Sequence, residues 1–119
     1  MSNGLPPLSV AVERRVRWAV VRVAGELDYR TSPSLTSELV RLAREPAVPR
    51  VCVDLARVWF CDSSGIASLL GGWQAIRARG GVMVLRRPRA TLSRRVIRMG
   101  LSGVLNVVDD LPDDEPAER

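Results

Sequence analysis

Short apolar runs of strand length alternate with longer runs of helical periodicity along most of this chain of 119 residues. Two valine-rich runs, residues 8–13 and 15–24, flank a charged turn and indicate a hairpin of two strands. Thr31 and Ser32 then offer N-cap side chains ahead of Pro33, which suits the first turn of a helix. The buried stripe of this first helix consists of leucines at spacings of four and three: Leu35, Leu39 and Leu42.

The same alternation continues in the middle of the chain. Apolar runs at residues 51–55 and 58–61 precede a polar turn and a second helical pattern, which ends at Gly80 and Gly81. A further strand is predicted at residues 82–85. The core face of the second helix is predicted to consist of apolar residues at helical spacing: Ile66, Leu69, Leu70, Trp73 and Ile76.

A third helix is predicted to begin at Pro88 and to be capped by Gly100. Its expected core face consists of Leu92, Val96 and Met99. Residues 104–108 suit a last short strand. Together these elements predict an α/β fold: a single domain with a mixed β-sheet of four to five strands flanked by helices.

We expect the folded domain to span residues 8–108. Residues 1–7, with two prolines, are predicted to be a flexible N-terminal lead, and residues 109–119 an acidic C-terminal tail with six of the thirteen acidic residues. No segment approaches the ~20 apolar residues that a membrane-spanning helix needs. The first residues also lack the basic start and apolar block of a signal peptide. We therefore expect a cytoplasmic protein without membrane insertion.

The residue types present exclude several kinds of chemistry. The chain has no histidine, which excludes a histidine general base, a Ser-His-Asp triad and histidine metal ligands. Cys52 and Cys61 are too few for a disulfide framework or a structural zinc site, so we expect buried free thiols. The sequence also offers no paired carboxylates, activated nucleophile or phosphate-binding loop. We therefore predict a binding protein rather than an enzyme, with no catalytic residues, cofactor or metal.

Charge is distributed unevenly along the chain. All eighteen basic residues are arginines, and seventeen of them lie in residues 1–108 against seven acidic residues, a formal balance of +10. No recognised nucleic-acid motif accompanies these scattered arginines. We therefore predict a basic surface that faces an acidic protein partner rather than direct contact with nucleic acid. Binding of DNA or RNA through the arginines is the alternative, and its affinity would fall steeply with salt.

The turn Asp62-Ser63-Ser64-Gly65, between an apolar strand end and a helix, is the most informative feature of the chain. The free N–H groups at a helix N-terminus favour an anion, so a phosphate on Ser63 would be tolerated there. Such a phosphate would add a charge of about −1.5 to −2. The same residues are also a good N-cap sequence, and most such turns do nothing more, so the turn by itself favours a purely structural role.

Four elements of the sequence resemble the STAS-domain anti-sigma-factor antagonists. Residues 58–66 resemble that family's signature, an apolar strand end followed by Asp-Ser-Ser/Thr-Gly-Leu-Gly, and residues 25–28 its Gly-Glu-Leu/Ile-Asp element. Downstream, the break at Gly80 and Gly81 with its strand, and then residues 94–101, are similar to its last helix and the small-residue turn after it. The likeness covers residues 8–108 in the family's order, and it departs at Ala67, where the family has glycine.

The resemblance implies a function for the polar turn. In that family the serine directly after the aspartate is the phosphoacceptor, which is Ser63 here, with Ser64 as the second candidate. The serine kinase that modifies it is also the anti-sigma factor. The unmodified antagonist binds this kinase and frees the sigma factor, and the phosphorylated antagonist is released, which regulates transcription by partner switching.

The predicted partner-binding surface combines the residues implied by the resemblance with an exposed-looking tryptophan: Asp28, Trp59, Asp62, Ser63, Ser64 and Gly65. Trp59 is either an interface anchor or packs against a neighbouring helix. Release is expected to follow from like-charge repulsion between the phosphate and the two aspartates.

The alternative function within the same family is binding alone. Such a domain would be a non-catalytic scaffold of a stress-signalling assembly or an accessory subunit of a membrane transporter. The sequence pattern does not indicate an oligomeric state in either case.

Overall fold

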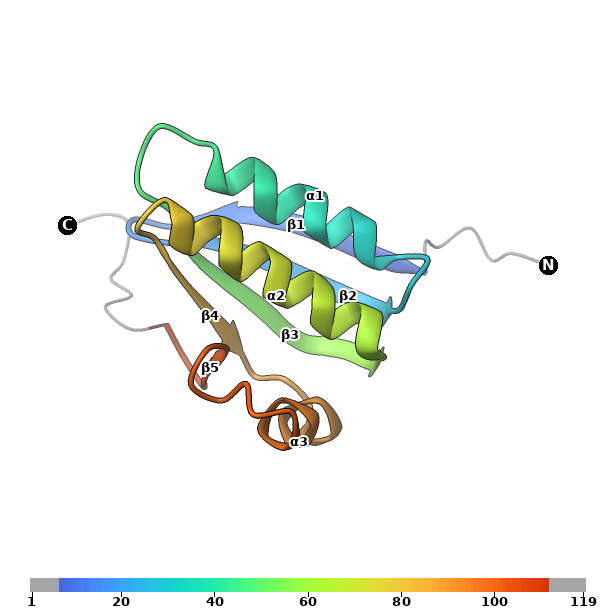
Figure 1. Ribbon diagram of the computed structural model, residues 1–119. Helices are drawn as coiled ribbons and strands as arrows, with labels where there is room; N and C mark the ends of the chain where they lie inside the picture. The colour runs from blue at the N-terminus through green and yellow to red at the C-terminus, as the bar shows by residue number, and fades with distance from the viewer. Residues whose placement is uncertain (1–6, 112–119) are drawn as a thin grey trace.

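One mixed sheet in the strand order β1-β2-β3-β4-β5 forms the centre of the computed structural model, which describes residues 7–111 (Figure 1). Strand β1 pairs antiparallel with β2, and β2 to β5 are parallel neighbours. In chain order the elements are β1 (Leu8–Arg14), β2 (Ala19–Leu27), α1 (Ser32–Ala43), β3 (Arg50–Cys61), α2 (Ser63–Ala78), β4 (Val82–Arg86), α3 (Ala90–Arg98) and β5 (Asn106–Val108). The predicted α/β fold with a mixed sheet is therefore confirmed.

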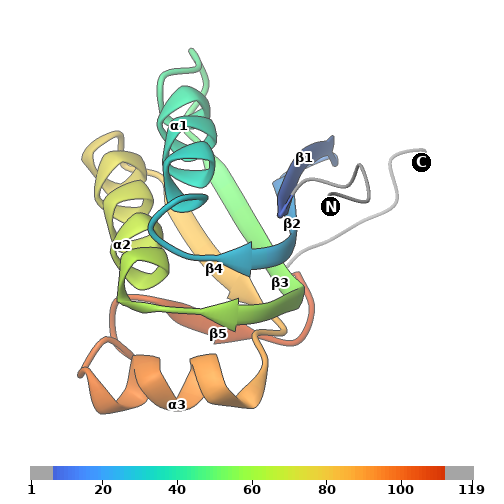
Figure 2. The ribbon, with the colours of Figure 1, turned by 90° about the vertical axis from the view of Figure 1, so that its right-hand side faces the viewer.

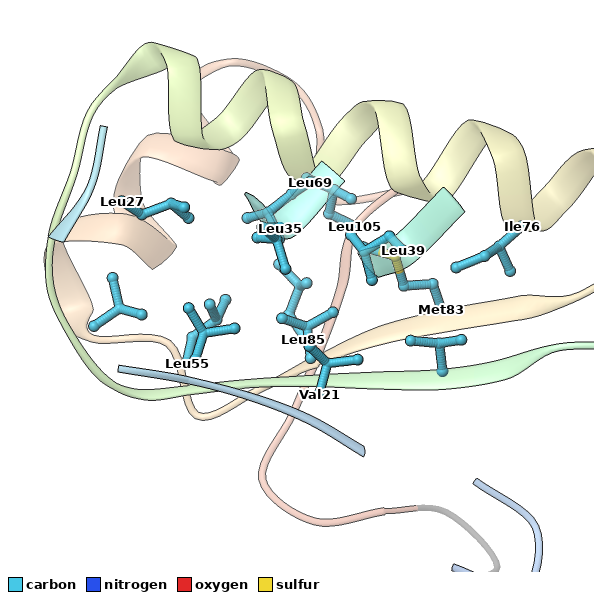
Figure 3. Packing of buried hydrophobic residues seen from close by; sticks show 14 of the residues in the cluster. Val21, Leu27, Leu35, Leu39, Leu55, Leu69, Ile76, Met83, Leu85 and Leu105 are labelled. Atoms are coloured by element: carbon cyan, nitrogen blue, oxygen red, sulfur yellow. The ribbon is translucent and has the colours of Figure 1, made fainter. Parts of the chain in front are cut away.

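Helices α1 and α2 lie side by side over one face of the sheet, and α3 lies apart from them near β5 (Figures 1 and 2). The leucine stripe predicted for the first helix is confirmed, since all three side chains are at most 1% exposed. In α2, Leu70 and Trp73 are only half-buried. The main core lies between this helical layer and the sheet, and Figure 3 shows part of it: Leu27, Leu35, Leu39, Leu55, Leu69, Ile76 and Leu85.

The opposite face of the sheet combines a small apolar cluster with a polar ladder. The cluster consists of Trp18, Val20, Cys52, Val84 and Leu111. Arg22, Asp54 and Arg86 lie directly opposite one another on β2, β3 and β4. Arg86 Nη2 donates to Asp54 Oδ2 at 2.7 Å, and Arg22 Nε donates to Glu13 Oε1 at 2.9 Å. Opposite charges on neighbouring strands support the sheet where no helix of the described residues covers it.

Strand β3 differs from its prediction, because residues 51–55 and 58–61 belong to one continuous strand. Strand β2 pairs with it from Ala19 to Leu27 and absorbs two register shifts on the way. Strand β4 pairs only with the first half, Arg50 to Asp54. The second half of β3 therefore extends past β4, and Trp59 and Phe60 near its end are exposed.

The other boundaries shift for local reasons. Strand β2 begins at Ala19 rather than at residue 15, because Arg15 N–H donates to the carbonyl of Trp18 within the hairpin turn. Helix α3 begins at Ala90, two residues after the proline, and Met99 is 54% exposed at its C-cap instead of lying in the core. Gly100 follows with φ +74°, which confirms the predicted cap.

The ends of the chain complete this description. Strand β5 spans only residues 106–108, because Leu105 N–H donates to the carbonyl of Leu101 in a turn that takes up the predicted strand start. The predicted lead at residues 1–7 and the acidic tail at 109–119 fall mostly outside the described residues. Among residues 7–111, no helix is both long enough and apolar enough to cross a membrane.

The ion pair between Asp54 and Arg86 gives the sheet a testable dependence on pH. Burial alone would raise the pKa of Asp54, but hydrogen bonds from Arg86 and from the N–H of Ala56 outweigh it and hold that pKa below its ordinary value. Because the carboxylate titrates lower in the folded chain than in the unfolded one, its stabilisation is present above about pH 4 and disappears as the pH falls through the folded-state pKa.

We expect Asp54→Asn to lower the free energy of unfolding by about 1 kcal/mol at pH 7, because it weakens a charge-assisted hydrogen bond. The difference from the parent should shrink at pH 3. Urea unfolding at both pH values measures it. Glu13→Gln, which weakens a more exposed pair on the same face, is the control and should cost less than about 0.5 kcal/mol. An equal loss for Asp54→Asn at both pH values would contradict this account.

Candidate functional site

The predicted site residues gather at the carboxyl edge of the parallel strands, where β2 and β3 end. Leu27 and Cys61 are paired as the last residues of these strands, and the N–H of Asp62 donates to the carbonyl of Leu27 at 3.2 Å. The turns that begin with Asp28 and Asp62 therefore lie next to each other. This edge is where open α/β sheets commonly bind their ligands.

The side chain of Asp62 caps helix α2. Its Oδ1 accepts hydrogen bonds from the N–H groups of Ser64 at 2.9 Å and Gly65 at 3.1 Å. The helix N-terminus therefore already holds a carboxylate, whereas the sequence suggested free N–H groups at that position. Asp62 thus has a structural role that is independent of any partner.

The two candidate phosphoacceptors differ in exposure. Ser63, the first residue of α2, is exposed, and Ser64 is half-buried. A kinase must enclose the acceptor hydroxyl, so exposure favours Ser63 over Ser64. Ser63 therefore meets the accessibility that a phosphoacceptor requires.

Gly65 is buried where α2 begins, and its lack of a side chain lets the helix approach the strands. A Cβ at this position would lie 2.6 Å from Cys61 Sγ and 2.8 Å from the Leu27 carbonyl oxygen. The sequence analysis placed Gly65 in the partner-binding surface, but the residue is buried and supports the site from beneath. Ala67, which departs from the family pattern, is exposed.

Asp28 is 8% exposed, and its carboxylate faces its own turn. Oδ1 accepts hydrogen bonds from the N–H groups of Arg30 at 2.9 Å and Thr31 at 3.1 Å. Burial would raise the pKa of Asp28, but these hydrogen bonds outweigh it and leave the pKa below its ordinary value. Asp28 organises the turn between β2 and α1, so it adds little exposed charge to the surface where a contact was expected.

Three exposed aromatic side chains lie close in sequence to the two turns, two at the end of β3 and one directly after Asp28. Trp59 is 59% exposed, Phe60 50% and Tyr29 72%. Trp59 also lines a groove against α3 together with Arg89 and Leu92, which agrees with packing against a neighbouring helix. Its role as an interface anchor stays a prediction. The sequence analysis gave Phe60 and Tyr29 no role; two adjacent aromatic residues at a strand end were the available signal for Phe60.

Helix α3 brings two arginines to Ser63. A groove of about 450 Å³ is lined by Asp62, Ser63, Arg95, Arg98 and Met99. Arg95 Nη1 donates to the carbonyl of Cys61 at 3.2 Å, which ties α3 to the end of β3. The sequence analysis assigned these arginines no role, although their i, i+3 spacing places them on one face of a helix.

Cys61, next to the turn, is a half-buried free thiol. Burial, followed by the negative charge of Asp62, raises its pKa to about 11. The thiol therefore stays protonated at neutral pH and is a poor nucleophile. The serine hydroxyl stays the predicted reactive group of the turn.

Comparisons with known proteins agree with this geometry. The family model described as "Mlab, STAS domain" matches residues 10–109. An anti-sigma-B factor antagonist of Bacillus subtilis is 31% identical over 103 residues, which are 86% of this chain and 89% of the relative.

Two solved structures share the fold at 24% sequence identity. The anti-sigma factor antagonist SpoIIAA in its unphosphorylated form matches with a TM-score of 0.72, over 86% of this chain and 90% of that one. The Bacillus cell fate determinant SpoIIAA in the phosphorylated form matches with a TM-score of 0.69, over 86% of this chain and 93% of that one.

The cap at the start of α2 can be tested by two substitutions of one residue. Asp62→Ala should lower the free energy of unfolding by about 1 kcal/mol, because it leaves two N–H groups without their acceptor. Asp62→Asn is the matched variant, since asparagine caps about as well and should change stability by only a few tenths of a kcal/mol. Chemical denaturation measures both. Equal stability of Asp62→Ala and the parent would contradict the capping role.

Proposed function

This chain belongs to the STAS domain family, and on that premise we propose that it is an anti-sigma factor antagonist that works in the cytoplasm by partner switching. In the unmodified state it binds an anti-sigma factor that is also a serine kinase, so that the sigma factor is freed. Phosphorylation of Ser63 then releases it. The observation that carries the proposal is an exposed serine at the start of α2 that shares a groove with two arginines.

The modification is a phosphoryl transfer performed by the kinase, with ATP as the donor. A bond forms between Ser63 Oγ and the γ-phosphorus, and the bond from that phosphorus to the β–γ bridging oxygen breaks. ADP leaves, and the hydroxyl proton passes to a base of the kinase. This chain contributes the acceptor and its surroundings, which suits a substrate and binding partner rather than an enzyme.

The surface around Ser63 has the composition of a docking site. Trp59, Phe60 and Tyr29 offer large apolar area that costs little conformational entropy to order, and aromatic anchors of this kind carry much of the energy of many interfaces. Arg95 and Arg98 add positive charge on one side of the serine. A partner that presents an apolar pocket beside acidic side chains would complement this surface.

Release requires only a local change of charge. The groove lining of two arginines and one aspartate has a formal charge of +1, and a phosphate of about −2 would reverse it to about −1. A tenfold loss of affinity needs only about 1.4 kcal/mol. A relative of the same fold matches this chain about equally well in its unphosphorylated and phosphorylated forms, which supports a switch without refolding.

Variants of Ser63 test the switch. Ser63→Ala should bind the anti-sigma kinase like the unmodified parent and should not be released when ATP is added. Ser63→Asp should bind about tenfold more weakly, because it places negative charge where the partner docks. Binding to the kinase recovered from a lysate of the native cells measures both, and mass spectrometry of the native protein locates the phosphate.

The matched control is Ser37→Asp, which adds the same charge at an exposed serine of α1 away from the groove. It should bind like the parent. Parent-like binding by both Ser63 variants would refute the switch, and phosphate found only at other residues would refute the acceptor. A partner that is not a kinase and ignores Ser63 would instead indicate the alternative of a binding-only STAS subunit.

The exposed tryptophan tests the position of the interface. Trp59→Ala should weaken binding of the unmodified protein to the kinase at least tenfold, because it removes an aromatic anchor. It should lower the free energy of unfolding by no more than about 2 kcal/mol, because the side chain is 59% exposed and only its remainder packs against the protein. Val48→Ala is the control: Val48 is equally exposed, at the opposite end of the sheet, and its loss should leave binding unchanged. Undiminished binding by Trp59→Ala would place the interface elsewhere.

A further inference from the structure

We propose that Arg95 and Arg98 form a phosphate clamp within the chain, which holds the phosphate of modified Ser63 in the groove between the start of α2 and helix α3. The inference rests on the proposed function, because it takes Ser63 as the phosphoacceptor. It adds the question of where the phosphate goes once it has been transferred. The structure supplies cationic partners for it in the same chain.

The geometry of the groove supports this assignment. The serine and both arginines line one open groove of about 450 Å³, a volume within the range of small-molecule sites. Leu92 and Val96 are buried and anchor α3 against the core, whereas Arg95 and Arg98 of the same helix are exposed. Arg95 is further oriented by its hydrogen bond to the carbonyl of Cys61.

The charges around the arginines favour an added anion. Within residues 7–111, neither Arg95 nor Arg98 forms an ion pair with an acidic side chain, whereas Arg86 at the end of β4 and the next residue, Arg87, both do. Arg95 uses one N–H group on Cys61 and retains others, since a guanidinium has five. Planar guanidinium groups suit phosphate oxygens because they can donate two parallel hydrogen bonds.

Asp62 is the opposing group, since its carboxylate lines the same groove. Its Oδ1 is occupied by the N–H groups of Ser64 and Gly65, so part of its charge is already stabilised by the start of α2. Two guanidinium groups against one such carboxylate still leave the groove positive. A phosphate on Ser63 would also lie at the positive end of a 16-residue helix.

The clamp gives the release step a physical cause that repulsion alone does not supply. With Asp28 facing its own turn, little exposed negative charge of this chain is available to repel the phosphate. A phosphate held by Arg95 and Arg98 would instead occupy the two cations that the unmodified surface offers to acidic groups of a partner. Phosphorylation would thereby weaken the electrostatic attraction between these two arginines and the acidic groups of the partner.

The test uses the full chain with phosphoserine incorporated at position 63 during synthesis, so it needs no kinase. The second pKa of the phosphate, about 6 in free phosphoserine, is read by ³¹P NMR during a pH titration at low salt. Nearby guanidinium groups favour the dianion, so this pKa should be lower in the parent than in Arg95→Gln/Arg98→Gln by about 0.5 to 1 unit. Arg98→Gln alone should give a smaller rise and keeps the Arg95 hydrogen bond to Cys61.

Arg94→Gln is the matched control, because Arg94 lies on the same helix but does not line the groove. It should titrate like the parent, and thermal unfolding should show that every variant is folded. A phosphate pKa that is the same in the parent, Arg98→Gln and the double variant would overturn the clamp. Failure of the clamp can be told apart from failure of the proposed function. The titration tests the clamp without any kinase, and the binding of Ser63→Ala to the kinase tests the proposed function without any phosphate.

Discussion

The site depends on the close approach between the first turn of α2 and the paired ends of β2 and β3. Gly65 permits this approach, because any Cβ there would overlap Cys61 Sγ and the Leu27 carbonyl. The hydrogen bond from Asp62 N–H to Leu27 joins the same two strand ends. With Gly65 packed against the strand ends, Ser63 lies on the exposed side of the first turn of α2. The exposed hydroxyl is therefore a product of backbone packing, and the Asp62 cap secures the helix that presents it.

Features of the fold that arise from local chemistry could be predicted from the sequence. The leucine stripe of α1 follows from helical spacing, the cap at Gly100 from its tolerance of positive φ, and the exposed Ser63 from its place after a capping aspartate. The limits of β3 could not be predicted in the same way. They depend on how far β2 and β4 each pair with it, and that is decided by residues distant in sequence.

The site shows the same division between local and tertiary causes. An aspartate after a strand can point to solvent or fold back on its own turn, and the hydrogen bonds to Arg30 and Thr31 settle this for Asp28. The hydrogen bond from Arg95 to the carbonyl of Cys61 links residues 34 positions apart, so no local sequence pattern could predict it. Sequence reasoning therefore pointed to the candidate acceptor, whereas the cations beside it became visible only once α3 was placed.

Net charge is a weaker guide to partners than the placement of unpaired charge. The arginine excess over residues 1–108 suggested a generally basic surface, yet several arginines form ion pairs along the sheet and α1: Arg14 with Glu45, Arg22 with Glu13, Arg41 with Glu38 and Arg86 with Asp54. Those pairs are spread over the molecule and favour no particular contact. The two groove arginines differ, because they line one groove together with the exposed serine. A single added dianion can therefore change the sign of this surface while the rest of the protein remains as it was.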